Sequence, residues 1–229
     1  MNWHNREIQL LRHRYNCQIN DPAYPVLGGR IGKWLMDWHH RRHGVPTDGM
    51  RSSERAIEIP LAIDFLSNEV KGEPVLELGC VLPYYILKAD NHVVYDLMDG
   101  HPENIRRDIR ALADDELRAN VVSISTIEHI GKSDYGIEAR GDAESVVVLK
   151  RILANAKRCF ITFPLGHNAS LDEFALDCQE LGEVYLTRCP TNPEMWMPVE
   201  KESLTPAMRT ENTYLRANTI CVIERTELR

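Results

Sequence analysis

The sequence predicts an α/β fold built on an open, mostly parallel β-sheet. One observation is that short apolar runs alternate with longer amphipathic stretches along most of the chain, which is typical of strands joined by crossover helices. Another is the stretch 74–85, PVLELGCVLPYY, in which an apolar run ends at Gly79 and a further apolar segment follows. A strand, a glycine turn and a helix present free backbone N–H groups where nucleotide-like ligands bind. A single glycine is equally compatible with a strand–turn–helix that has only a structural role.

The expected elements follow in order along the chain. Residues 1–20 are amphipathic, and Trp34 and Trp38 give a second short helix an apolar side, so residues 1–50 are expected to form a helical lid. Residues 51–229 are expected to form the main domain, with a polar, proline-rich connection over 190–206. Its helices are expected at 56–68, 82–88, 143–156 and 170–181, and its strands at 75–78, 92–96, 105–109, 120–125, 158–163, 183–188 and 219–224.

Length and composition limit the classes of protein that fit. A chain of 229 residues with 43% apolar content is large enough for one sizeable core. The net charge is −7, and residues 1–55 carry +4, with nine basic and five acidic residues, so the remaining 174 residues carry −11 and the main domain is acidic. An acidic domain disfavours nucleic acid as a partner, because counterion release requires a basic face. The basic segment is compatible with an anionic substrate or, equally, with a solvated helical face.

Location and metal content are also constrained. The chain has no run of eighteen apolar residues and no apolar signal region near its start, so we expect no membrane span and a cytoplasmic protein. Six cysteines without a C-x-x-C pair favour reduced thiols. His39 and His43 share a helix face, but no third ligand is evident nearby, so no metal site is expected. Homo-oligomer formation stays open.

Acidic residues follow the expected strands at their carboxyl ends. Asp96 ends the second strand about twenty residues after Glu77, where a carboxylate can accept hydrogen bonds from both hydroxyls of a ribose. Asp108 precedes the apolar Ile109 at the expected end of the third strand. The fourth strand runs into a polar segment that begins at Ser125. The alternative for Asp96 is a turn-initiating aspartate.

Five segments together resemble a known family, the class I S-adenosylmethionine-dependent methyltransferases. They are ERAIEIP (54–60), VLELGCVLPYY (75–85), HVVYDLMD (92–99), RDI (107–109) and SISTIEHIG (123–131). The resemblance covers about residues 51–224 and is greatest to a subgroup with motifs similar to VLEVGNVLSHY and STLEHVG. It implies a Rossmann-like seven-stranded sheet with helices on both faces, and a seventh strand antiparallel beside the sixth. One departure is that Val81 and Pro83 replace glycines of the common motif.

The resemblance also implies a cofactor, S-adenosylmethionine, and roles for residues that match its motifs. Asp96 is expected to hold the ribose hydroxyls, and Arg55 or Glu58 is expected either to reach the methionine end or to have a plain surface role. The further cofactor contacts it implies are Glu77 and Gly79 on the methionine and ribose side, Asp108 and Ile109 at the adenine, and Ser125 and Thr126 below the sulfonium.

The acceptor side is expected to involve histidines. His129 follows the fourth strand, and imidazole has a pKa suited to accepting a proton from a hydroxyl near neutrality. The alternative is a structural pair with Glu128. His167 is a second candidate, and the expected acceptor contacts are Asp134, Tyr135 and Trp196, with core packing as the alternative for the tryptophan.

These features lead to one main hypothesis and two rivals. The main one is methyl transfer to a small molecule, with a hydroxyl of a sugar or glycan precursor as the acceptor by analogy with the subgroup. A catalytically silent binding or scaffolding protein is the first rival, because of Val81 and Pro83. A dehydrogenase is disfavoured, because the glycines that bind a pyrophosphate are absent.

Overall fold

The computed structural model describes residues 54–226 apart from 86–90, 137, 179–180, 182, 190–191 and 210–216. The expected helical lid, residues 1–50, lies outside the described residues, as does the start of the main domain. In the described part, no helix is long and apolar enough to cross a membrane.

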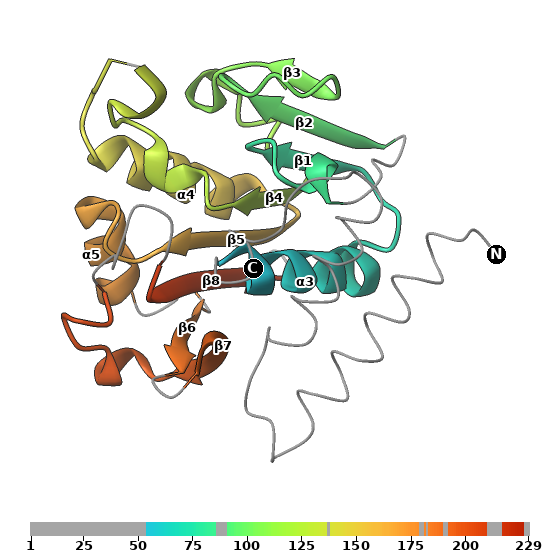
Figure 1. The fold of residues 1–229 in the computed structure, drawn as a ribbon. Coiled ribbons are helices and arrows are strands. Elements are labelled where there is room, and N and C mark those ends of the chain that lie inside the picture. Colours follow the sequence, from blue (N-terminus) through green and yellow to red (C-terminus); the bar gives the residue numbers. More distant parts are fainter. Residues whose placement is uncertain are drawn as a thin grey trace.

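The centre of the fold is an eight-stranded mixed sheet (Figure 1). The order of its strands is β3-β2-β1-β4-β5-β8-β6-β7. The first five in this order are parallel, whereas β8 is antiparallel to both β5 and β6, as expected for the last strand. The bounds are β1 Val75–Leu78, β2 His92–Asp96, β3 Asn104–Arg106, β4 Asn120–Ile124, β5 Arg158–Pro164, β6 Glu183–Cys189, β7 Asn192–Val199 and β8 Thr219–Arg225.

In the part of the chain that the structure describes, three α-helices pack on the sheet. They are α3 Arg55–Phe65, which continues as a π-helical turn over Leu66–Val70, α4 Ala143–Asn155 and α5 Ala169–Asp177. Short 3₁₀ turns connect the strands at Leu82–Tyr84, Ile109–Ala111, Ile127–His129, Asp134–Gly136 and Lys201–Ser203. The expected helix over 82–88 is therefore a 3₁₀ turn in its described part.

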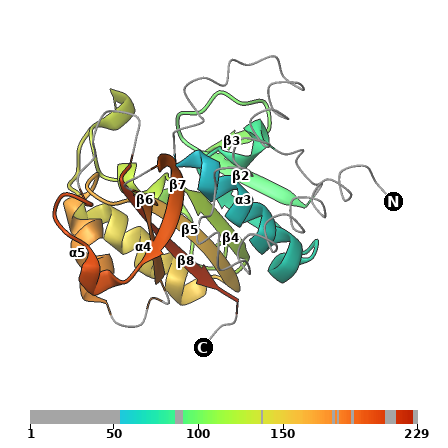
Figure 2. The same ribbon diagram turned by 60° about the horizontal axis from the view of Figure 1, so that its bottom comes forward.

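Alternate residues of the central strands supply two separate apolar cores. Val122 of β4 packs in the core that includes α3, whereas its neighbour Val121 packs in the core that includes α4 and α5. This alternation follows from the two-residue period of a strand, and it buries both faces of the parallel part of the sheet. Figure 2 shows α3 on one side of the strands and α4 with α5 on the other. Helices on both faces are thus confirmed.

The predicted count of seven strands is wrong, because residues 192–199 form an eighth. This segment was expected to be a polar connection, since Pro193 and Pro198 cannot donate backbone hydrogen bonds. It forms β7 at the edge of the sheet of described strands, where it pairs with β6, and an edge strand tolerates proline. The third strand also differs from expectation. It ends at Arg106, and Asp108 lies outside it, where its side chain caps the 3₁₀ turn that begins at Ile109.

Candidate functional site

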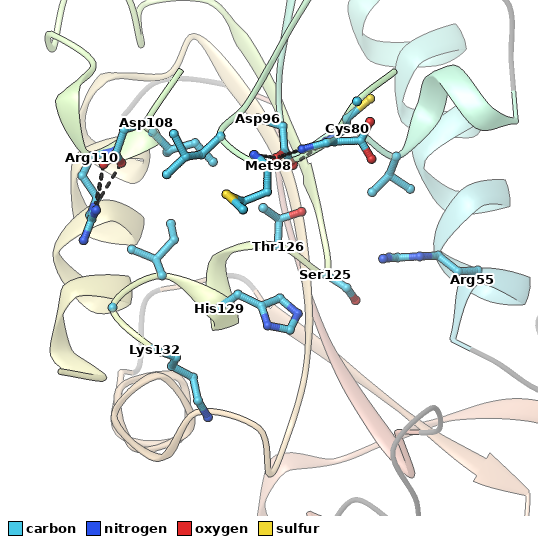
Figure 3. A pocket seen from close by; sticks show the side chains of 17 residues that line it. Arg55, Cys80, Asp96, Met98, Asp108, Arg110, Ser125, Thr126, His129 and Lys132 are labelled. Carbon is cyan, nitrogen blue, oxygen red and sulfur yellow. Dashed lines mark hydrogen bonds and ion pairs between the residues drawn. The ribbon is translucent and has the colours of Figure 1, made fainter. Parts of the chain in front are cut away.

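A cavity of about 430 Å³ opens at the carboxyl edge of the sheet. Side chains from the ends of β2 and β4, from the turn after β1 and from the turn after β3 surround it (Figure 3). The carboxyl edge of parallel strands is where open α/β sheets bind ligands. The residues expected from sequence that line it are Asp96, Asp108, Ile109, Ser125, Thr126, His129 and Arg55.

The Asp96 carboxylate organises the turns on either side of the cavity. Its Oδ1 accepts hydrogen bonds from the backbone N–H groups of Met98 at 2.7 Å and Asp99 at 2.9 Å. Its Oδ2 accepts one from the N–H of Cys80 at 3.1 Å, which ties the turn after β1 to the end of β2. A carboxylate oxygen can accept two hydrogen bonds. The backbone therefore fixes the orientation of Asp96. Oδ2 accepts one hydrogen bond from the described residues and can accept a second.

Glu77 shapes the cavity from beneath and does not line it. Its side chain is fully buried, and Oε1 accepts hydrogen bonds from the N–H groups of Val81 at 2.9 Å and Leu82 at 2.7 Å. Its Oε2 lies 2.8 Å from Nε2 of His92. Glu77 is therefore placed to support the turn and not to contact a cofactor directly. Its buried carboxylate accepts hydrogen bonds from N–H groups of the turn that would otherwise have no partner there.

Gly79 allows β1 and β4 to end close together. Its φ is +91°, and a Cβ at this position would lie 2.0 Å from Oγ1 and 2.5 Å from Cγ2 of Thr126. Both the backbone conformation and the space therefore require glycine. Gly79 does not line the cavity, whereas Thr126, which occupies the space beside it, does.

The Asp108 carboxylate is paired with an arginine from its own turn. Oδ1 accepts a hydrogen bond from the backbone N–H of Arg110 at 2.9 Å, and the Arg110 guanidinium donates to both carboxylate oxygens. Arg110 also pairs with Glu144 of α4 at 2.9 Å. Hydrogen bonds from Arg110 hold the pKa of Asp108 below its usual value, although burial alone would raise it. Asp108 is therefore a fixed, ionised wall of the cavity.

A buried carboxylate, Glu58, joins α3 to the ends of β4 and β5. Its Oε1 accepts hydrogen bonds from the hydroxyls of Ser125 at 2.6 Å and Thr162 at 2.7 Å. Its Oε2 pairs with Arg55 Nη1 at 2.8 Å. Ser125 has a φ of +37°, which is uncommon for a residue other than glycine and is held here by this network. Glu58 is fully buried, whereas its partners Arg55, with a side chain 22% exposed, and Ser125 line the cavity.

Two histidines share one carboxylate beside the cavity. Asp134 Oδ2 lies 2.6 Å from Nδ1 of His129 and 3.2 Å from Nε2 of His167. The imidazole rings meet edge to face, with centroids 4.5 Å apart. Burial lowers the pKa of His129, while the hydrogen bond with Asp134 opposes this. Burial would raise the pKa of Asp134, but the hydrogen bonds with both histidines lower it. The three candidates from sequence thus form one cluster, with His129 at the cavity (Figure 3).

Glu128 points away from the cavity, into the protein. Its side chain is 2% exposed, and its Oε1 lies 3.8 Å from Nε2 of His129. Burial raises the pKa of the Glu128 carboxyl well above its usual value. The backbone carbonyl of Glu128 accepts a hydrogen bond from the Asn168 side chain at 3.1 Å, which joins the loops after β4 and β5. Glu128 therefore has the structural role, while the His129 imidazole is at the cavity.

Trp196 lies far from the acceptor position expected for it. It is on β7 at the far edge of the sheet, fully buried in the core that includes α3, and the Arg188 guanidinium lies 4.4 Å from its ring centroid. The alternative of core packing is therefore confirmed, and the expected acceptor contact is wrong. Tyr135 is in the 3₁₀ turn Asp134–Gly136. Its side chain is not among those described, so its expected contact with an acceptor stays a prediction.

Several lining residues were not predicted from the sequence. Met98 and Asp99 follow Asp96 by two and three positions, and Arg110 follows Asp108 by two. Proximity in sequence to a predicted acid was the available signal for these. Lys132 precedes Asp134 by two positions, so the same signal was available for it, whereas the hydrogen bond from its ammonium to the backbone carbonyl of His167 spans 35 residues and could not be predicted locally.

Asp172 of α5 is expected to make stability depend on pH. Its Oδ2 accepts a hydrogen bond from the Gly166 N–H at 2.7 Å, and burial raises its pKa to about 6. The folded protein thus retains a proton that the unfolded chain loses near pH ~4, so this group's contribution to stability falls as the pH rises from about 4 to 6.

We expect Asp172→Asn to be about as stable as the parent near pH 4 and more stable by about 1 kcal/mol at pH 7, after allowance for partial solvent screening. The measurement is urea unfolding of both proteins at several pH values between 4 and 7. A difference that stays constant across this range would contradict the expected titration of Asp172.

Comparisons with known proteins add little to this geometry. No family model matches the chain, and no curated protein matches it. Among solved structures, a crystal structure described as Thermoplasma acidophilum 1320 is similar with a TM-score of 0.40 and 10% sequence identity, over 85% of this chain and 97% of that one. A likeness of this degree carries no argument about function.

Proposed function

We propose that the protein transfers a methyl group from S-adenosylmethionine to a small-molecule acceptor. The observation that carries the proposal is that residues from separate parts of the chain, each assigned a role by the family resemblance, line one cavity of about 430 Å³. A volume of this order is typical of sites for small molecules and cofactors. The residues are Asp96, Asp108, Ile109, Ser125, Thr126 and His129.

The charges around the cavity support one orientation of the cofactor. Asp108 and Arg110 lie on one side and Arg55 on the other, with Asp96 between them (Figure 3). In the proposed pose, adenine lies near Asp108 and Ile109, and the ribose hydroxyls donate to Oδ2 of Asp96. The methionine carboxylate then lies toward the Arg55 guanidinium, which is the complementary charge at that end.

The acceptor side follows from the position of His129. S-adenosylmethionine carries its own leaving group, so the protein mainly has to hold an acceptor in line with the methyl group. Asp134 accepts the proton on Nδ1 of His129 in this proposal, which leaves Nε2 to take the proton of an acceptor hydroxyl. A hydroxyl of a sugar or glycan precursor is the proposed acceptor.

The cytoplasm is the proposed location, because cytoplasmic proteins keep their cysteines reduced. Among the described residues, the free thiols are Cys80, Cys159, Cys178 and Cys221.

A second candidate function is a non-catalytic protein that keeps this fold. The observation that favours it is that two acids of the cavity already have protein donors: Asp96 accepts three backbone hydrogen bonds, and Asp108 is paired with Arg110. Val81 and Pro83 replace glycines of the common motif as well. In this case the same residues stabilise the turns and bind no cofactor.

Calorimetric titration of the full chain with S-adenosylmethionine, and separately with S-adenosylhomocysteine, distinguishes the two functions. Micromolar binding of both ligands is the result expected of a methyltransferase. Absence of heat and of any thermal shift with both ligands would give the lead to the non-catalytic protein.

Asp96→Ala is expected to weaken the binding of both ligands at least tenfold, which corresponds to about 1.4 kcal/mol. The cause is loss of the acceptor for the ribose hydroxyls. Asp96→Asn retains one carbonyl oxygen for the turn, so it separates loss of the ligand contact from loss of the turn. Asp177→Ala, at the exposed end of α5, is the control and is expected to bind as the parent does. Unchanged affinity in both Asp96 variants would contradict the ribose assignment.

A further inference from the structure

The cluster of His129, Asp134 and His167 has a composition that the proposed methyl transfer does not require. Nδ1 of His129, Oδ2 of Asp134 and Nε2 of His167 all lie within 4.8 Å of one another. They come from the turn after β4, from the 3₁₀ turn that follows it and from the loop after β5. The three side chains are 28%, 31% and 21% exposed, so the cluster is partly shielded and still open to solvent.

We propose that these three side chains bind one divalent transition-metal ion. Two imidazoles and one carboxylate are the donor set that first-row transition ions such as Zn²⁺ and Fe²⁺ take in proteins, with further positions left open. Mg²⁺ and Ca²⁺ prefer oxygen donors alone, so they fit this set poorly. In a tetrahedral site, bonds of about 2.1 Å place donor atoms roughly 3.4 Å apart, and the 3.2 Å between Asp134 and His167 is near this distance. His129 lies 2.6 Å from Asp134, so its ring must move away from the carboxylate by less than an ångström to share an ion with it.

Glu128 provides a second, independent observation. Its buried Oε2 makes no hydrogen bond within the described residues, and its Oε1 lies 3.8 Å from Nε2 of His129. A histidine that binds a metal through one ring nitrogen usually donates its other N–H to a carboxylate, which fixes the ring and strengthens the ligand. The Glu128 carboxyl lies beside Nε2 of His129 at 3.8 Å, which is longer than a hydrogen bond, so it would have to move closer to accept this N–H when an ion binds.

The loops that carry the ligands are tied to each other without the ion. The Lys132 ammonium donates to the backbone carbonyl of His167, and the Asn168 side chain donates to that of Glu128 at 3.1 Å. Fixed loops reduce the ordering cost of binding an ion. The positive charge of Lys132 repels a metal ion at the cluster. The negative charge of Asp134 attracts the ion and offsets this repulsion.

Binding of an ion would change the chemistry of His129. An ion on Nδ1 replaces the proton there, and the remaining ring proton resides on Nε2. His129 then donates a hydrogen bond and no longer accepts a proton from an acceptor, so the two roles exclude each other at a given moment. The ion site can be tested separately from the binding of S-adenosylmethionine, because the proposed cofactor contacts at Asp96 and Asp108 involve none of its three ligands.

The test is calorimetric titration of the metal-stripped full chain with Zn²⁺, together with the visible spectrum after addition of Co²⁺. The measurement is made in a background with His39, His40 and His43 replaced by alanine, so that any binding of the ion to these histidines is removed. One equivalent of Zn²⁺ with micromolar or tighter affinity is expected in this background. Asp134→Asn and His167→Ala are each expected to weaken it at least tenfold.

His101→Ala is the matched control, because His101 is a partly buried histidine that packs against Tyr84 and lies outside the cluster. It is expected to retain the full affinity for Zn²⁺. Thermal unfolding without metal shows whether each variant is folded. The proposal is overturned if the background protein binds no Zn²⁺ at micromolar concentration, or if folded Asp134→Asn and His167→Ala both bind as tightly as their parent. Either result leaves the titration with S-adenosylmethionine, and thus the proposed function, untouched.

Discussion

Gly79→Ala is expected to destabilise the protein by about 3 kcal/mol, from two costs of similar size. Alanine at a φ of +91° is strained by about 1–2 kcal/mol. Its Cβ would also lie 2.0 Å from Oγ1 and 2.6 Å from Cβ of Thr126, and β-branched threonine has little freedom to move away. The ends of β1 and β4 must therefore separate, which also deforms the cavity between them.

Urea unfolding of Gly79→Ala and of Gly72→Ala separates the two costs. Gly72 has a similar φ of +85°, but a Cβ there meets nothing within 4 Å. Gly72→Ala is therefore expected to lose only the strain, about 1 kcal/mol. Equal losses in the two variants would show that the contact with Thr126 relaxes without cost. The double variant Gly79→Ala with Thr126→Gly is expected to recover the part that arises from the contact.

Glu58→Ala is expected to have an effect of at least the same size, about 3–5 kcal/mol. The carboxylate is fully buried and is the acceptor for the Ser125 and Thr162 hydroxyls as well as the partner of Arg55. Its removal leaves a cation and two hydroxyls without their acceptor in the protein interior. Because Arg55 and Ser125 both line the cavity, we also expect S-adenosylmethionine to bind more weakly to the folded fraction.

The measurements are the free energy of unfolding and the calorimetric affinity, each for Glu58→Ala, Glu58→Gln and Glu69→Ala. Glutamine can still accept from the hydroxyls but cannot form an ion pair with Arg55, so an intermediate loss is expected. Glu69, half-buried in the π-helical turn that continues α3, is the control, with a change within about 0.5 kcal/mol. A parent-like stability of Glu58→Ala would show that Glu58 does not hold α3 to β4 and β5.

The two variants test different supports of one cavity. Gly79 determines how closely β1 and β4 approach, and Glu58 determines how α3 is joined to the ends of β4 and β5. The Asp96 variants act on the ligand contact itself. The Gly79 and Glu58 variants keep Asp96 and Asp108. If they nevertheless fail to bind the cofactor, the residues that hold the cavity in shape matter as much as the residues that contact the ligand.

The parallel part of the fold was predictable from sequence alone. The bounds of β1 and β2 agree with the prediction, because each is an apolar run that ends at a residue unfavourable in a strand, Gly79 in one case and Asp96 followed by a turn in the other. The convergence of some of the cavity residues was also predictable. Parallel strands place their carboxyl ends at one edge, so residues that follow these strands converge whatever their separation along the chain.

Tertiary structure alone decided the remaining features, because each depends on which segments become neighbours. The edge position of β7 makes Pro193 and Pro198 tolerable in a strand, and a local pattern does not show which strand will be at an edge. The burial of Glu77 beside His92 of the neighbouring strand and the core position of Trp196 depend likewise on packing. The cluster of His129, Asp134 and His167 joins residues up to 38 positions apart, so only the folded chain brings its two imidazoles to one carboxylate.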